Sequence, residues 1–224
     1  ILVRMPIRIP IGILITKISN LIFHNNSMIS SLIVAAAMYV GLTNPTVTES
    51  AKIAETPGDS IVWMPLADVN KIVEKNIKKN KVKEDKLIIV DFYTDWCGWC
   101  KRLDNETYKN AEVAALMNTY FYPVKFDAES RDSLNFAGVP YKFKPSGSRG
   151  TNEFALTMAS RPGGRIGYPT ITIISPMGEK IVVEAGYKNA DKMKLFLLYY
   201  GEGHYKTKDY ITFEKEYNQK QLTD

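Results

Sequence analysis

The segment Val90-Asp-Phe-Tyr-Thr-Asp-Trp-Cys-Gly-Trp-Cys-Lys101 contains the only two cysteines of the 224-residue chain. The apolar run that begins at Leu87 leads directly into it, interrupted only by Asp91, and predicts a strand buried on both faces over residues 87–93. A disulfide between Cys97 and Cys100 would close a very small loop and would constrain the unfolded chain little. We therefore expect the pair to serve chemistry rather than stability.

The composition is that of a soluble globular protein, with 45% apolar and 24% charged residues, so a core can form without disulfide support. The net charge of +5 raises the possibility of a nucleic-acid partner. Basic and acidic residues are interspersed, however, and the densest basic run, at residues 75–83, fits a solvated face better than a phosphate-binding patch. We expect no nucleic-acid partner.

The N-terminal part differs in character from the rest. Its first fifty residues hold three basic residues and one acidic residue, and the apolar run at 29–42 is too short to span a bilayer comfortably. Residues 1–42 are predicted to be a signal peptide or, if uncleaved, a membrane anchor, with a buried N-terminal helix as the alternative. Residues 43–60, rich in Thr, Ser, Pro and Glu, are predicted to be a flexible linker. This organisation predicts export to the periplasm or cell envelope.

The remaining pattern predicts one domain over residues 61–200, with an insertion at 129–150 and a C-terminal extension at 201–224. Strands and helices alternate early and a hairpin comes late, so we expect an α/β fold with a central mixed sheet flanked by helices. The strands are expected at 61–63, 87–93, 120–126, 170–174 and 181–184, with a hairpin formed by 134–136 and 141–143. The helices are expected at 66–78, 97–108, 111–117, 190–200 and 210–217, with a further one after Thr151 as its cap.

A buried strand that delivers C-x-x-C to the start of a helix suggests a mechanism. Free backbone N–H groups and the helix dipole would stabilise a thiolate at Cys97, which is then the nucleophile. Cys100 lies one turn along and could attack the mixed disulfide. This chemistry requires that a substrate can reach the sulfur of Cys97 from solvent.

Two other uses of cysteine are poorly supported. A structural zinc site needs two further ligands, and the chain offers only His24, in the predicted signal segment, and His204. A cysteine protease would have to use His204 as its base. We therefore predict no metal and no cofactor.

The cysteine segment, followed by Gly167-Tyr-Pro-Thr170 ahead of a strand, resembles the thioredoxin superfamily over roughly residues 61–200. The similarity is strongest to exported bacterial thioredoxin-like proteins with a Trp-Cys-Gly-Trp-Cys-Lys site and an Arg-Gly-Thr turn, here Arg149-Gly-Thr151. The resemblance implies that Pro169 is a cis-proline facing the site, with an ordinary trans-proline as the alternative. It also implies that the backbone of Tyr168 pairs with an extended substrate.

The same resemblance assigns further residues. Asp91 matches the buried carboxylate under the second cysteine, and Lys125 matches its lysine partner, so the pair would manage the proton of Cys100. The alternative is a structural ion pair without a catalytic part. Gly186 would line the substrate groove.

Two tryptophans flank the cysteines. Trp96 is expected to pack beside the thiolate. Trp99 stands where thioredoxin has proline, and residues between the cysteines affect the stability of the thiolate, so the redox potential of thioredoxin cannot be assumed for this protein. Trp99 could also be a surface contact for a protein partner.

The absence of histidine between the cysteines favours a reductant or isomerase. We predict a thiol–disulfide oxidoreductase acting on disulfide-containing proteins, with an unidentified thiol redox partner. A peptide-binding module and a copper-handling dithiol are the alternatives.

Overall fold

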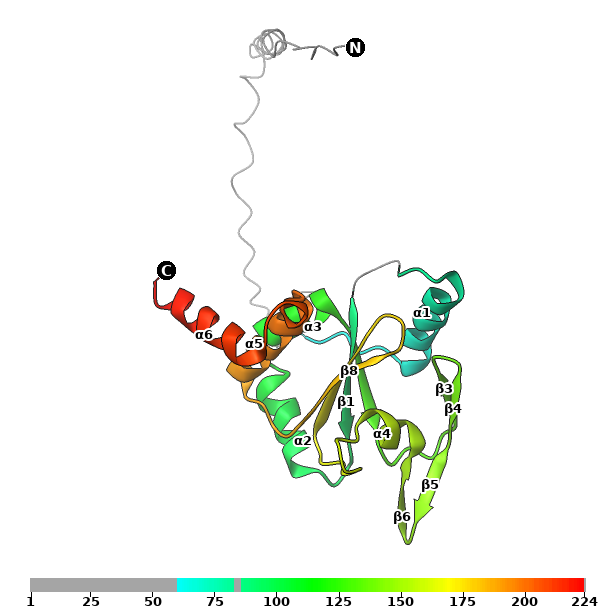
Figure 1. The fold of residues 1–224 in the computed structure, drawn as a ribbon. Helices are drawn as coiled ribbons and strands as arrows, with labels where there is room; N and C mark the ends of the chain where they lie inside the picture. The colour runs from blue at the N-terminus through cyan, green and yellow to red at the C-terminus, as the bar shows by residue number, and fades with distance from the viewer. Residues whose placement is uncertain (1–59, 83–85, 224) are drawn as a thin grey trace, which may run out of the picture. The chain divides into compact units, whose positions relative to one another are not determined.

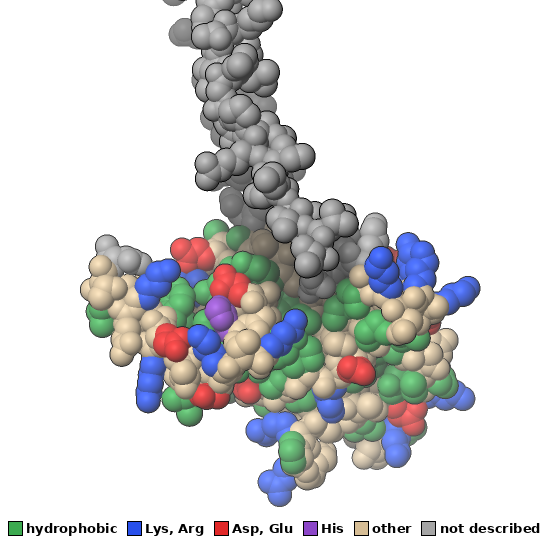
Figure 2. Space-filling model, turned by 45° about the horizontal axis from the view of Figure 1, so that its top comes forward, with side chains coloured by type: hydrophobic (Ala, Val, Ile, Leu, Met, Phe, Trp, Pro, Cys, Tyr) green, Lys and Arg blue, Asp and Glu red, His purple; other side chains and the backbone are tan. Residues whose placement is uncertain are grey.

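The computed structural model describes residues 60–82 and 86–223. The predicted signal segment, and the linker apart from its last residue, lie outside the described residues. Within the described part of the chain, no helix is long and apolar enough to cross a bilayer. On the face shown in Figure 2, Lys and Arg side chains are interspersed with Asp and Glu.

The centre of the domain is a four-stranded mixed sheet with the order β2-β1-β7-β8 (Figure 1). Strand β1 (Leu87–Tyr93) runs parallel to β2 (Phe121–Asp127) and antiparallel to β7 (Thr170–Ile174). Strand β8 (Lys180–Ala185) pairs antiparallel with β7 and forms the other edge. The predicted central mixed sheet is confirmed.

Helices cover both faces of this sheet (Figure 1). On one face, α1 (Leu66–Lys79) and α4 (Glu153–Met158) pack on one apolar cluster. On the other face, a second cluster joins the sheet to α3 (Ala111–Tyr120), α5 (Ala190–Gly201) and the helical segment after the cysteines. That segment consists of α2 (Gly98–Arg102), which continues as a π-helical turn over Leu103–Thr107.

Strand β1 divides its side chains between the two clusters, as the twofold repeat of a strand requires. Ile88, Val90 and Phe92 lie in the α1/α4 cluster, whereas Leu87 and Ile89 lie in the cluster with α3 and α5. The same alternation places Asp91 on the second face, under the helical segment that follows the cysteines. A carboxyl group is thereby carried into the core next to that segment.

Two sequence predictions in the N-terminal and central parts are wrong. Residues 61–63 do not form a strand: the segment makes a single backbone hydrogen bond to β2, from the Met64 amide to the Pro123 carbonyl at 2.7 Å. Thr151 does not cap α4, because it pairs with Lys144 in a strand. The cap is Asn152, whose side chain accepts a hydrogen bond from the Phe154 amide.

The segment between β2 and α4 contains two hairpins instead of the predicted one. Strand β3 (Leu134–Phe136) pairs with β4 (Val139–Tyr141), and β5 (Phe143–Ser146) pairs with β6 (Arg149–Asn152). The predicted strand at 141–143 is therefore split between two ribbons. The β5–β6 ribbon projects from the end of the domain at which α2 begins (Figure 1).

The residues after α5 fold back on it. A short 3-10 turn (His204–Lys206) leads to α6 (Tyr210–Gln221), whose Phe213 is buried against Tyr199 of α5. The Tyr199 hydroxyl donates a 2.7 Å hydrogen bond to the Lys208 carbonyl, which joins the connection to the helix.

The buried cap Asn152 should hold the two hairpins to α4. Its amide nitrogen donates to the carbonyls of Ser130 and Asp132, at 3.1 and 2.9 Å, and its side chain is fully buried. We expect Asn152→Ala to lower the free energy of unfolding by roughly 2–3 kcal/mol, because the buried Phe154 amide and two part-buried carbonyls lose their partner. Urea unfolding measures this. The exposed cap Asn189, which accepts only from the Lys192 amide, is the control and should lose about 1 kcal/mol on substitution by alanine. Equal losses would contradict the assignment.

Candidate active site

The two cysteines lie at the start of α2 and form a disulfide, with their Cα atoms 5.3 Å apart. Cys97 is the N-cap of the helix, in extended conformation, and its sulfur accepts a 3.0 Å hydrogen bond from the Cys100 amide. An N–H group that already points at this sulfur would favour a thiolate after reduction. The backbone thus prepares one of the two sulfurs for nucleophilic attack.

Both cysteines are more covered than the sequence analysis expected. Cys97 is 5% exposed and Cys100 is 3% exposed, whereas the neighbouring Trp96 and Trp99 are 53% and 55% exposed. The expectation that a substrate can reach the Cys97 sulfur from solvent is not met in this disulfide form, in which both cysteines are buried. Cys97 keeps only a slightly larger exposed fraction than Cys100.

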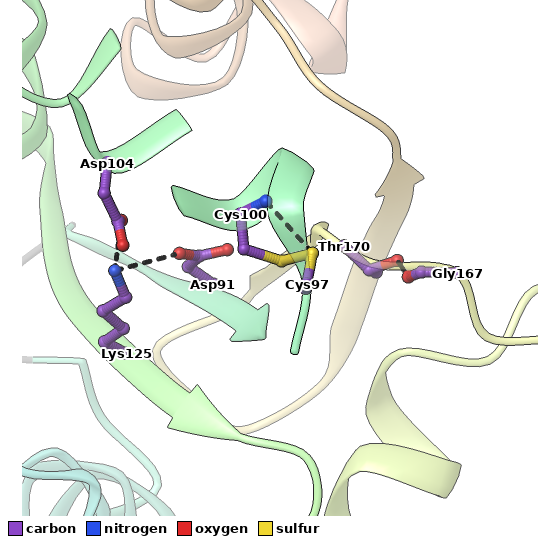
Figure 3. Close-up of a disulfide and its surroundings, with 7 residues drawn as sticks. All are labelled: Asp91, Cys97, Cys100, Asp104, Lys125, Gly167 and Thr170. Carbon is purple, nitrogen blue, oxygen red and sulfur yellow. Dashed lines mark hydrogen bonds and ion pairs between the residues drawn. A yellow bond between two sulfur atoms is a disulfide. The ribbon is translucent and has the colours of Figure 1, made fainter. Parts of the chain in front are cut away.

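Asp91 lies beneath the disulfide, and its carboxyl points toward the Cys100 side (Figure 3). It is 1% exposed, and neither of its oxygens has a hydrogen-bond partner among the described residues. The Lys125 amine, from the register partner of Asp91 on β2, lies 4.0 Å from one of these oxygens. That amine makes its hydrogen bond to Asp104 instead, a residue of the π-helical turn.

Burial raises the pKa of Asp91 to about 7. The positive charge of Lys125 opposes this rise, whereas the negative charge of Asp104 adds to it. The Tyr108 hydroxyl approaches the carboxyl and opposes the rise slightly, without meeting hydrogen-bond geometry. The carboxyl can therefore gain or lose a proton close to neutral pH.

The lysine side chain is itself enclosed. Its amine lies over three aromatic rings, at 5.2 to 5.8 Å from their centroids, namely those of Trp63, Tyr93 and Tyr108. These rings stabilise the cation without offering a hydrogen-bond acceptor in their faces. The lysine is thus held beside the carboxyl rather than in contact with it.

The loop before β7 provides the opposite wall of the site. The Tyr168–Pro169 peptide bond is cis, as the resemblance implied. The Pro169 carbonyl accepts a 2.8 Å hydrogen bond from the Gly186 amide, and Gly186 has a φ of 100°, a conformation that side chains disfavour. The Tyr168 amide and carbonyl take no part in the backbone hydrogen bonds found in the described part of the chain.

A first aromatic cluster surrounds Trp96. The Arg149 guanidinium lies 5.1 Å from the centroid of the Trp96 ring system, and the Tyr168 ring meets it edge-on at 6.0 Å. The indole N–H donates a 3.1 Å hydrogen bond to Glu129. Arg149 comes from the β5–β6 ribbon, so the predicted insertion reaches the active site through this residue.

A second cluster surrounds Trp99. The Arg102 guanidinium lies 5.4 Å from the Trp99 ring centroid and 5.0 Å from that of Tyr187, and the two rings are 5.7 Å apart. Glu106 closes the group: it accepts hydrogen bonds from Arg102 at 2.9 and 3.0 Å and from the Tyr187 hydroxyl at 2.7 Å. Both tryptophans are thus fixed in position while half of each remains exposed.

Comparison with known proteins agrees with this geometry. Residues 50–147, somewhat less than half of the chain, match the family model Thioredox_DsbH, described as a protein of unknown function, DUF255. The match includes both cysteines, Asp91 and Lys125. The strand order, the cis-proline and the disulfide at the start of α2 give the chain a thioredoxin-like fold. No curated protein matches the chain.

Several solved structures are similar to this chain. A thioredoxin-fold protein from Helicobacter pylori is 19% identical, with a TM-score of 0.44, covering 59% of this chain and 80% of its own. A DsbH oxidoreductase is 15% identical, with a TM-score of 0.36 and coverages of 65% and 84%. The C-terminal domain of Neisseria meningitidis DsbD in its reduced form is 22% identical, with a TM-score of 0.36 and coverages of 60% and 96%. The strand order and the cis-proline described above, not these likenesses, identify the fold.

Sequence analysis missed several residues of the candidate active site. Asp104 could have been found, because it lies four residues after Cys100 and therefore on the same helix face. Glu129 and Arg149 come from the segment between β2 and α4, and nothing in their sequence context points to Trp96. The same holds for Tyr187 and Trp99.

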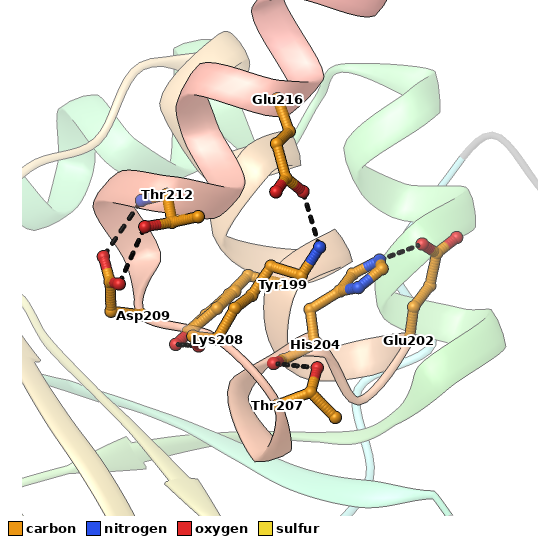
Figure 4. A network of polar contacts seen from close by, with 8 residues as sticks. All are labelled: Tyr199, Glu202, His204, Thr207, Lys208, Asp209, Thr212 and Glu216. Carbon is orange, nitrogen blue, oxygen red and sulfur yellow. Dashed lines mark hydrogen bonds and ion pairs between the residues drawn. The ribbon is translucent and has the colours of Figure 1, made fainter.

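No group of three His, Cys, Asp or Glu side chains suited to a metal ion occurs within residues 60–82 and 86–223. His204 lies between α5 and α6, where its ring stacks on Phe213 at 4.8 Å and contacts Glu202 at 3.0 Å (Figure 4). It belongs to the packing of the C-terminal helix rather than to the cysteine site.

The buried carboxyl should make the stability of the oxidised enzyme depend on pH. Because the pKa of Asp91 is raised to about 7, the folded protein keeps a proton that the unfolded chain releases near pH 4. Stability should therefore fall as pH rises between these values. We expect Asp91→Asn, which cannot ionise, to gain on the order of a few kcal/mol relative to wild type between pH 4 and pH 8. Urea unfolding of the oxidised proteins at both pH values measures this.

The control is the exposed Asp95, four residues further along. Asp95→Asn should leave the pH dependence of unfolding as it is in wild type. A constant difference between Asp91→Asn and wild type across this range would show that the carboxyl does not titrate near neutrality.

Proposed function

We propose that the protein is exported and reduces or isomerises disulfides of exported proteins, with Cys97 as nucleophile and Cys100 as resolving cysteine. The observation that carries this proposal is the position of the Cys97 sulfur at the start of α2, where the Cys100 amide already donates to it. Both cysteines are buried, and the Cys100 sulfur is the one toward which the ionisable Asp91 carboxyl points (Figure 3). The helix start favours attack by Cys97, and the carboxyl favours release by Cys100.

The reaction balances in two steps. The Cys97 thiolate attacks one sulfur of the substrate disulfide, forms a mixed disulfide and expels the other substrate sulfur as a thiolate. Cys100 then loses its proton and attacks the Cys97 sulfur, which forms the Cys97–Cys100 disulfide and expels the second substrate thiolate. The two electrons of the dithiol pass to the substrate. A thiol redox partner must supply two electrons to regenerate the dithiol.

Asp91 is the proposed acceptor of the Cys100 proton. A carboxyl with a pKa of about 7 is close to the ideal for proton transfer at neutral pH. Lys125 is proposed to stabilise the carboxylate form from 4.0 Å, while Asp104 holds the lysine and links the group to solvent through its partly exposed side chain. The Lys125 amine forms an ion pair with Asp91 at 4.0 Å but gives its hydrogen bond to Asp104, so both Asp91 oxygens are left without a hydrogen-bond partner among the described residues.

The substrate is proposed to bind as an extended strand along the loop of Pro169. The Tyr168 amide and carbonyl can pair with such a strand, as an exposed sheet edge does. Gly186 would leave room beside it, because a Cβ atom added there meets no atom within 4 Å. Trp96 and Trp99 would contact the substrate on either side of its disulfide.

Reduction or isomerisation is favoured over oxidation because the dipeptide between the cysteines is Gly-Trp, which lacks a histidine to stabilise the thiolate further. Export is proposed from the apolar N-terminal segment, and membrane contact would be limited to that segment if it is retained.

A peptide-binding module with little turnover is the second candidate function. It is favoured by one observation: the cysteines are only 5% and 3% exposed, whereas the tryptophans beside them are half exposed. A module of this kind would bind unfolded peptide equally well with or without its cysteines.

Cysteine variants separate the two functions. We expect Cys97→Ser to lose at least 100-fold in the reduction of insulin by dithiothreitol, because no nucleophile remains. We expect Cys100→Ser to accumulate a mixed disulfide with the substrate, visible by non-reducing electrophoresis. Unchanged insulin reduction by Cys97→Ser would refute the enzyme, and peptide binding without catalysed reduction by wild type would support the module.

Removing the carboxyl should slow the second step selectively. We expect Asp91→Asn to form the mixed disulfide at close to the wild-type rate but to resolve it at least 10-fold more slowly at pH 7.5, since the Cys100 proton has lost its acceptor. In wild type the resolution rate should rise with pH through about 7, where Asp91 deprotonates. Rapid-quench trapping of the mixed disulfide measures both steps. The matched control Asp95→Asn should retain the wild-type profile, and equal slowing of both steps by Asp91→Asn would point to a structural role.

A further inference from the structure

Basic residues are concentrated around one wall of the active site. Between residues 141 and 168 the chain has five basic residues and one acidic residue, a formal charge of +4, compared with +5 for all 224 residues. The five are exposed and belong to the β5–β6 ribbon and to the loop before the cis-proline: Lys142, Lys144, Arg149, Arg161 and Arg165. We call them the basic surface.

The ribbon presents part of this surface toward the disulfide. Lys144 pairs with Thr151, and Ser146 pairs with Arg149, so alternation places Lys144 and Arg149 on the same face of the ribbon. Arg149 stacks on Trp96, the residue before Cys97. The face that carries Lys144 is therefore the one turned to the active site.

The loop contributes the other part. Arg161 and Arg165 flank a turn in which the Arg161 amide donates to the Arg165 carbonyl at 3.3 Å and the Gly164 amide donates to the Arg161 carbonyl at 3.0 Å. The two arginines line an open hollow of about 510 Å³ with Pro162 and Gly163. This turn ends three residues before Tyr168, whose ring contacts Trp96. The ribbon and the loop thus meet at the same indole ring.

None of the five forms an ion pair with a side chain that the structure describes; the ion pairs found there all lie outside residues 141–168. Acidic groups are nearby, however: Glu129 accepts a hydrogen bond from Trp96, on whose ring Arg149 stacks, and Glu129 and Asp127 both act electrostatically on Tyr168. A cluster of unpaired cations attracts anions over about a Debye length, roughly 10 Å at 0.1 M salt. A substrate segment that passes the ribbon or the turn at residues 161–165 would lie within this field.

We propose that the basic surface selects protein substrates whose disulfide is flanked by acidic residues, by attracting the acidic segment while the disulfide approaches Cys97. This inference rests on the proposed disulfide exchange and adds the class of substrate. A protein segment fits better than nucleic acid or membrane, because the surface adjoins the reacting sulfur and the substrate strand must pass it. Charge complementarity here raises the association rate and the specificity.

The test uses three synthetic peptides with one internal disulfide and identical cysteine spacing, flanked by Glu, Gln or Lys. We expect wild type at 20 mM salt to reduce the Glu peptide with a kcat/KM about 10-fold above the Gln peptide, and this preference to vanish at 300 mM salt. The variant carries Lys144→Glu, Arg161→Glu and Arg165→Glu, which leave the cysteines and tryptophans intact. It should prefer the Lys peptide instead, with turnover of hydroxyethyl disulfide unchanged.

The matched control reverses the same amount of charge on α1, with Lys75→Glu, Lys78→Glu and Lys79→Glu on exposed positions. It should keep the wild-type preference for the Glu peptide. If both triple variants change the preference equally, the preference depends on net charge and not on the basic surface, and the proposal is wrong. Wild type that reduces all three peptides equally at low salt would overturn it. Failure to reduce any disulfide would instead refute the proposed function.

Binding separates the inference further from turnover. The binding probe is the Glu peptide with serine in place of both cysteines, and binding is followed by tryptophan fluorescence. Its Kd for wild type should be at least 10-fold lower than its Kd for the 144/161/165 variant. Two further probes are a single-stranded oligonucleotide and phosphatidylglycerol vesicles. If either binds wild type more tightly than the Glu peptide, and loses binding in the variant, the surface serves a polyanion and the proposal is wrong.

Discussion

The end of strand β1 is the constraint from which the active site follows. The strand lies between β2 and β7 and is buried on both faces, so neither its register nor its direction can change without loss of both apolar clusters. The chain that leaves it reaches Cys97, the cap of α2, within four residues. A slip of one residue would exchange Asp91 for Phe92 under the helical segment. The register of β1 therefore fixes the positions of both the cysteine pair and the Asp91 carboxyl.

That register places a carboxyl where it is costly to ionise. Both Asp91 oxygens lack a hydrogen bond among the described residues, and the lysine at 4.0 Å bonds to Asp104 instead. Direct contact with the lysine would hold Asp91 ionised, and removal of the lysine would hold it protonated. The intermediate arrangement keeps the pKa of Asp91 near 7. Destabilisation of the folded state and readiness for proton transfer thus have the same physical origin.

The central fold could be predicted from the sequence because its signals are local. The apolar run before the cysteines predicted β1 with the observed bounds, and the Gly-Tyr-Pro-Thr motif located the cis-proline. The ribbons were predicted less well, because segments of three or four residues can pair in more than one way. The contact of Trp96 with Arg149 could not be predicted, since it joins distant segments through exposed side chains whose pairing no periodicity specifies. The contact of Trp99 with Arg102 was within reach of the sequence, because the two residues are three apart on one helix.

Because the sulfurs are covered, substrate binding and disulfide exchange would depend on the same residues. Cys97 and Cys100 are almost entirely covered, while the indole rings on either side are half exposed and are held by Arg149 and Arg102. In the proposed reaction, a substrate would contact the rings and the Tyr168 backbone before its disulfide reaches Cys97. Binding energy from these contacts would orient the disulfide, which lowers the entropic part of the barrier. Arg149 belongs to the projecting ribbon and stacks on Trp96. In the proposed function, a substrate bound to the ribbon would therefore also lie against Trp96, so the same contacts would select the substrate and position its disulfide.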